Sequence, residues 1–72
     1  MNLPRYTYSL LFLHRDGSTE LFEHTTEDEA RAHLACFGID DADIYTRIDL
    51  FQTDWEATPL RNTRLDGITF PA

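Results

Sequence analysis

The chain has 72 residues, enough for one domain, so residues 1–72 are expected to form a single small globular unit. Thirteen acidic residues oppose six basic residues, all arginine, and the formal net charge is -7. This charge argues against direct binding to nucleic acid and against docking on an anionic membrane. The hydrophobic share of 42% is typical of a folded domain and not of a disordered tail.

The single cysteine, Cys36, cannot form a disulfide within the chain. A secreted domain of this size usually carries several disulfides, so we expect a cytoplasmic protein. The amino-terminal residues lack the basic stretch and apolar run of a signal peptide. The longest apolar run, residues 10–13, is far shorter than a membrane span.

Residues 6–14 are rich in aromatic and aliphatic side chains and predict a first strand. Both faces of this strand are apolar near its end, which is typical of a central position in a sheet. Residues 15–18 predict a hairpin turn, because Gly17 can adopt the positive φ that such turns need. Residues 19–23 are then expected to return antiparallel to the first strand.

The register of this hairpin depends on the length of its loop. A two-residue loop, Asp16 and Gly17, would place Phe12 opposite Leu21. A three-residue loop with a glycine bulge would place Phe12 opposite Glu20 instead, and Leu10 opposite Phe22. The two registers exchange the sheet face on which each side chain of the second strand lies. We favour the three-residue loop.

A helix is predicted from Thr26 to about Phe37. Thr26 and Glu29 form a capping-box pattern, and the acids of the first turn suit the positive end of the helix dipole. The expected core face of the helix comprises Ala30, Leu34 and Phe37, with His33 beside them.

The end of this helix is expected at Gly38, in a left-handed conformation that would let Ile39 fold back on Leu34. The next residues, 40–43, are read as a polar connection.

Residues 44–53 alternate in a way that predicts a third strand. One face is expected to meet the helix, and it carries Ile44, Thr46, Ile48 and Leu50. The other face carries Tyr45, Arg47, Asp49 and Phe51. A loop with Trp55 follows, then a weaker strand over residues 60–65 that bulges or turns at residues 66–67 and resumes at residues 68–70.

The predicted fold is α+β with the order ββαββ: a four-stranded, mostly antiparallel sheet with one helix packed on one face. One helix of about three turns can cover only one face of such a sheet. The other face must therefore be polar or must meet a partner. Interfaces are enriched in aromatic residues and arginine. The predicted partner-binding residues are therefore Tyr45, Arg47, Asp49, Phe51 and Trp55.

Few residues of the sequence suggest catalysis or metal binding. The histidines His14, His24 and His33 lack the spacing of a zinc site, so we predict His14 and His24 to be exposed and His33 to flank the helix core. Cys36 lies late in the helix, where the dipole disfavours a thiolate, and is expected to be partly buried and inert. We predict no catalytic residues, no bound metal and no cofactor.

The acidic residues form a second candidate surface. Its expected members are Glu27, Asp28, Asp40, Asp41 and Asp43. Asp41 and Asp43 match part of a calcium loop, but the glycine and terminal glutamate of that loop are missing. Carboxylates spaced like phosphates could occupy a basic groove, so a nucleic-acid mimic is one hypothesis. Charge that only keeps the protein soluble is the simpler interpretation.

Together these patterns favour a non-enzymatic acidic module that binds another protein, as an inhibitor or adaptor of a larger host or phage protein. One alternative is a self-associating structural domain, for example a homodimer through an edge strand, with no separate client. The other is the nucleic-acid mimic.

Overall fold

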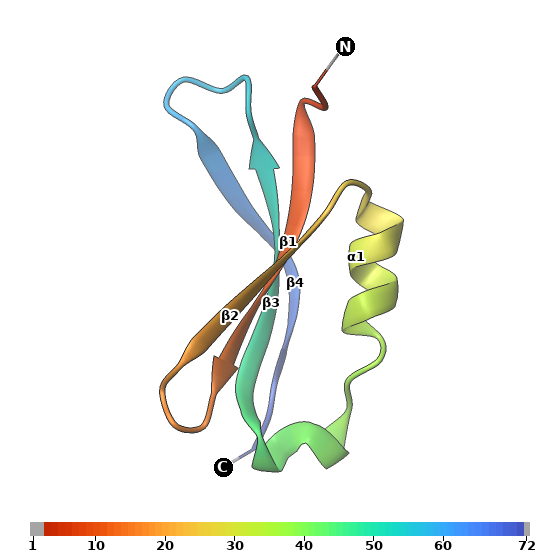
Figure 1. The fold of residues 1–72 in the computed structure, drawn as a ribbon, viewed down its shortest axis with the longest axis vertical. Helices are drawn as coiled ribbons and strands as arrows, with labels where there is room; N and C mark the ends of the chain where they lie inside the picture. Colours follow the sequence, from red (N-terminus) through yellow and green to blue (C-terminus); the bar gives the residue numbers. More distant parts are fainter. Residues whose placement is uncertain (1–2, 72) are drawn as a thin grey trace.

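A four-stranded antiparallel sheet with one helix on one side forms the protein, whose computed structural model describes residues 3–71 (Figure 1). The strands lie in the order β2-β1-β3-β4. Their bounds are Tyr6–His14 (β1), Thr19–His24 (β2), Tyr45–Asp54 (β3) and Arg61–Thr69 (β4). Helix α1 (Glu27–Leu34) and the 3₁₀-helix η1 (Ile39–Asp43) connect β2 to β3. The predicted class and the ββαββ order are confirmed.

The first hairpin has the register of the three-residue loop. Phe12 pairs with Glu20 and Leu10 with Phe22. The loop closes through a bond of 2.9 Å from the His14 amide to the Ser18 carbonyl, and Gly17 has a φ of 92°. Glycine suits this left-handed conformation, and the bond between His14 and Ser18 defines the three-residue loop.

Helix α1 begins as predicted but ends three residues early. The Thr26 side chain accepts a bond of 3.2 Å from the Glu29 amide, which caps the first turn. After Leu34 the amides of Cys36 and Phe37 each bond three residues back, so the last turn tightens. The predicted helical position of Phe37 is therefore wrong.

The left-handed helix end predicted at Gly38 is also wrong. Gly38 has a φ of -151°, which is extended backbone, and its amide donates a bond of 2.8 Å to the Asp41 carboxylate. This bond starts η1 in place of the expected polar connection. Ile39 does not fold back on Leu34 and has 69% of its surface exposed.

The hydrophobic core lies between α1 and the sheet. Its buried members are Leu10, Phe12, Ala30, Leu34, Ile48, Leu50 and Phe70. The Phe12 ring is at the centre, with the rings of Phe22, Phe37 and Tyr45 centred 5.2–5.5 Å away. Such tilted and edge-to-face arrangements are the favoured geometries of aromatic pairs. We call this side of the sheet the covered face.

Tyr45 belongs to the covered face, which contradicts its predicted place on the other side. The β1–β3 register shifts by one residue, because Leu13 pairs with Arg47 but His14 pairs with Tyr45. This bulge interrupts the alternation and turns the Tyr45 ring toward Phe12. Ile44, predicted to face the helix, precedes β3 and has 51% of its surface exposed.

Candidate interface on the uncovered sheet face

The side of the sheet opposite α1 has no covering layer within residues 3–71 (Figure 1). We call it the open face. Along β1, Ser9, Leu11 and Leu13 alternate with the buried Leu10 and Phe12 and so lie on this side. The pairing across the sheet extends the face to Leu21, Glu23, Arg47, Asp49, Phe51 and Thr53. Arg47, Asp49 and Phe51 thus lie where the sequence predicted them.

A groove of about 460 Å³ crosses the open face. Its apolar lining comprises Leu11, Leu21, Phe51, Trp55 and Leu60. Leu21, Trp55 and Leu60 each keep 50–58% of their surface exposed, whereas Leu11 and Phe51 are half-buried. Large apolar side chains that gather around a groove and stay exposed are typical of a binding surface.

Trp55 is held in place at one end of this groove, although it belongs to the loop after β3. Its indole Nε1 donates a bond of 2.8 Å to Thr7 Oγ1 on β1, and its backbone amide donates to the Arg5 carbonyl at 2.8 Å. The indole donor is therefore satisfied while half of the side chain faces solvent. An aromatic side chain fixed in this way loses little conformational entropy when it is buried by a partner.

Asp49 is a buried carboxylate on the open face, with 6% of its surface exposed. Two arginines from different strands lie over it. Arg47 makes two bonds of 2.8 and 3.0 Å to the two carboxylate oxygens, and Arg64 Nε makes one of 2.8 Å to Oδ1. Burial pushes the pKa of Asp49 up, but the hydrogen bonds and charges of the two arginines outweigh it and hold this pKa below its ordinary value.

Gly67 makes room for this arrangement on β4, where it pairs with Asp49. A Cβ atom at position 67 would lie 2.8 Å from Asp49 Oδ1 and 2.9 Å from the Ile48 carbonyl oxygen, and would also collide with Arg64. Glycine is therefore required where the arginine crosses the strand.

Charge is divided unequally between the two sides of the molecule. On the open face, the two carboxylates of Glu23 and Asp49 are matched by Arg47 and Arg64. On α1 and η1, six carboxylates accompany one arginine. The open face is thus close to neutral, and the net charge of -7 resides mainly elsewhere.

The predicted acidic surface lies on α1 and η1, away from the open face. Two of its five members have structural partners: Glu27 accepts a bond of 2.6 Å from Arg31, and Asp41 accepts one from the Gly38 amide. Asp28, Asp40 and Asp43 are exposed.

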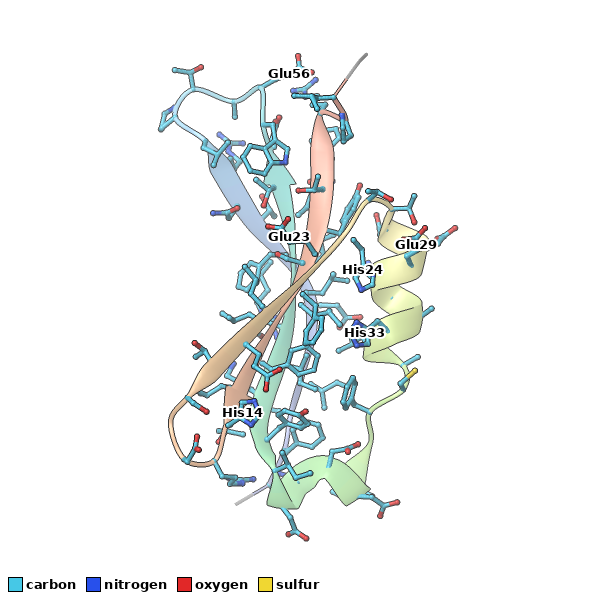
Figure 2. All side chains as sticks on the ribbon, viewed as in Figure 1. His14, Glu23, His24, Glu29, His33 and Glu56 are labelled. Carbon is cyan, nitrogen blue, oxygen red and sulfur yellow. The ribbon has the colours of Figure 1, made fainter. Side chains whose placement is uncertain are left out.

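The histidines are more embedded than predicted. His24 Nε2 lies 2.9 Å from His33 Nδ1, and the Glu29 carboxylate is 3.9 Å from His24 Nδ1 (Figure 2). Burial, and then the charge of His24, lower the pKa of His33. His14 is half-buried and bonds Glu20 at 2.7 Å. The prediction that His14 and His24 are exposed is therefore wrong.

Cys36 is exposed and lies just beyond the end of α1, so its predicted partly buried helical position is also wrong. Its thiol donates to the Ala32 carbonyl at 3.4 Å. Within residues 3–71, no three histidine, cysteine or acidic side chains gather as a metal-binding group.

Sequence reasoning missed several residues of the open face, namely Leu11, Leu21, Leu60 and Arg64. For Leu11 and Leu21, the sequence contained a signal that could have placed them on this face. The favoured hairpin register pairs Leu11 with Leu21, and β1 is apolar on both faces. Leu60 and Arg64 could not be placed. Leu60 precedes β4, and Arg64 lies on this strand, which has a weak pattern and a register shift opposite Leu50 and Phe51 of β3.

No protein-family model, curated protein or solved structure matches the chain. In the described part of the chain, the helices are too short and too polar to span a membrane.

Proposed function

We propose that this protein is a non-enzymatic binding module that contacts another protein through its open face. In the cytoplasm it would act as an inhibitor or adaptor of that partner. The observation that carries the proposal is the groove with Leu21, Trp55 and Leu60 half-exposed around it. Leaving such side chains in water costs free energy that binding recovers at about 25 cal/mol per Å² of apolar surface.

The composition of the open face supports a protein partner. An apolar centre with leucine, phenylalanine and tryptophan lies beside two arginines that are both paired with Asp49. Protein interfaces combine an aromatic, arginine-rich centre with few uncompensated charges. A nucleic acid would instead require free cations along the groove.

The lining of the groove supports binding better than catalysis. Among the described residues that line it, Glu23 is the only acidic residue, and none is a histidine, cysteine, lysine or arginine. General acid–base catalysis relies on groups with separated pKa values within reach of one substrate. A single carboxylate at the edge of an apolar groove does not provide this.

A photo-crosslinking amino acid placed in living cells tests the proposal. Position 51 lies on the open face, where Phe51 is half-buried, and position 39 is an apolar and more exposed position among the acids of η1. We expect crosslinked protein from position 51 and little from position 39. Crosslinks from position 39 alone would instead support the nucleic-acid mimic, whose contact surface is the acidic side, and would refute the proposed use of the open face.

A further inference from the structure

The division of charge and the size of the open face point to a specific occupant. We propose that the occupant is a second copy of this chain, packed sheet against sheet with both α1 helices on the outside. This inference rests on the proposed use of the open face as a protein contact. It names a second copy as the occupant of that face, which the inhibited or adapted partner would have to displace.

Charge is the first argument. The copies each carry -7, so they repel unless their acidic surfaces stay apart. Contact through the open faces puts the acids of α1 and η1 on opposite outer surfaces. The smallest dimension of the molecule is 17 Å and stacked sheets lie about 10 Å apart, so the acidic surfaces are separated by more than two screening lengths of about 8 Å.

The same charges argue against a strongly charged partner at this face. Arg47 and Arg64 both bond Asp49 at 2.8 Å, so these three side chains together carry one positive charge, and Glu23 on the same face balances it. A basic partner would be attracted to α1 and η1, on the wrong side of the molecule. A partner surface that is itself apolar and nearly neutral matches best, and the open face of another copy has that character.

Size is the second argument. The open face runs along the 42 Å axis and across the 17 Å axis of the molecule, because α1 lies beside the sheet in the view down the shortest axis (Figure 1). A face of that extent is comparable with the roughly 800 Å² that each partner contributes to a standard protein interface. Two such sheets would pack as in a β-sandwich, where the side chains of both inner faces form one core about 10 Å thick.

Self-complementary shape is the third argument. A two-fold interface requires the same patch to supply both a protrusion and a recess. The open face has both: Leu11 and Phe51 are half-buried in the groove, and the more exposed Leu21, Trp55 and Leu60 flank it. In a two-fold pair, the flanking side chains of one copy can enter the groove of the other.

Three matched variants test the inference on the purified chain. Leu21→Arg, Leu60→Arg and Ile39→Arg each replace an aliphatic side chain that is 50–69% exposed and each add one positive charge. Leu21 and Leu60 flank the open face at opposite edges of the sheet, whereas Ile39 belongs to η1. Their masses are measured by sedimentation equilibrium across the micromolar range, and circular dichroism verifies that each variant is folded.

We expect the wild type and Ile39→Arg to sediment at twice the 8.4 kDa of one chain. Leu21→Arg and Leu60→Arg should weaken the pair by about 30-fold or more, as at a hot-spot position. A single-chain mass for the wild type overturns the inference. The inference is also overturned if only one of the two open-face variants breaks the pair, because that result indicates pairing through one edge strand.

The two proposals fail in distinguishable ways. A monomeric wild type combined with a crosslink from position 51 to a heavier protein refutes the pair and leaves the binding module standing. A dimer that survives both open-face variants, with no crosslink from position 51, refutes both.

Discussion

The two faces of the sheet receive alternate residues of the same strands, yet they are protected from water in different ways. On the covered face, Leu10 and Phe12 of β1 are fully or almost fully buried beneath α1 and its neighbouring rings. On the open face, Leu11 is only half-buried, and the buried residue is a carboxylate, Asp49, beneath two arginine side chains. The covered face therefore has a hydrophobic core that is closed by α1. The open face is covered only in part, by long side chains of its own strands.

The difference shows what a single short helix can do. Eight residues of α1 cover part of one side of a 42 Å long molecule, so the remaining apolar residues must be accommodated in another way. Arginine can serve because its aliphatic stem covers apolar surface while its guanidinium reaches a carboxylate. The apolar residues beyond the reach of the arginines stay exposed around the groove, and we assign the contact function to them.

The largest expected effect comes from replacing a phenylalanine by alanine on each face and comparing the two losses of stability. Phe12→Ala should lower the free energy of unfolding by about 3–5 kcal/mol, which is most or all of the stability of so small a domain. Phe51→Ala removes a half-buried ring and should cost about 1–2 kcal/mol. Urea denaturation followed by circular dichroism measures both. Equal losses would mean that Phe51 is a core residue and that the two faces do not differ.

A second test concerns the buried carboxylate. Asp49→Asn should cost about 1–3 kcal/mol at neutral pH, because it removes the charge that the two arginines share. Since the folded-state pKa of Asp49 lies below its ordinary value of 3.8, its contribution is fully present above that value and is lost as the pH falls through the folded pKa.

The stability difference between wild type and Asp49→Asn should therefore be constant at neutral and mildly acidic pH and shrink below about pH 3.8. Urea titrations at a series of pH values measure it. Asp54→Asn is the control on the same strand. Its partner Arg5 is exposed, so the loss should be the smaller one expected of a surface ion pair. A difference between wild type and Asp49→Asn that grows in acid would contradict the assigned role of the arginines.

The smallest expected effect concerns the covered face, at the contact between His24 and His33. Burial lowers the folded-state pKa of His33 below 6.5, so its contribution is fully present above pH 6.5 and is lost as the pH falls through the folded value. In the His33→Gln variant, the free energy of unfolding should therefore depend less on pH in this range. Proton NMR of the histidine rings measures the pKa directly, and a His33 pKa above 6.5 would refute the argument.

Much of the fold could be predicted because its signals are local. Gly17 favours one hairpin loop, Thr26 and Glu29 mark the start of α1, and strict alternation places Ile48 and Leu50 opposite Arg47 and Asp49. The helix end that was predicted wrongly also depends on local signals, and two of them compete there. Gly38 has a suitable sequence position for a helix end, but the bond from its amide to Asp41 starts a second helix instead.

The candidate site was predictable in part for the same reason. Arg47, Asp49 and Phe51 follow from alternation along β3. Tyr45 does not, because a bulge against β1 reverses its side. The pairing of His24 with His33 joins a strand end to a helix, and their separation in sequence gives no sign of it.

The sequence by itself determined the acidity, the order of the elements and the existence of one sheet face that α1 cannot cover, because composition and short-range periodicity control these properties. Only the tertiary structure decided that Arg64 crosses Gly67 to reach Asp49, and that Leu21, Trp55 and Leu60 gather around one groove. The register shift between β3 and β4 sets the position of Arg64 relative to Asp49. A shift of one residue carries no signature in the local pattern, yet it changes which side chains meet.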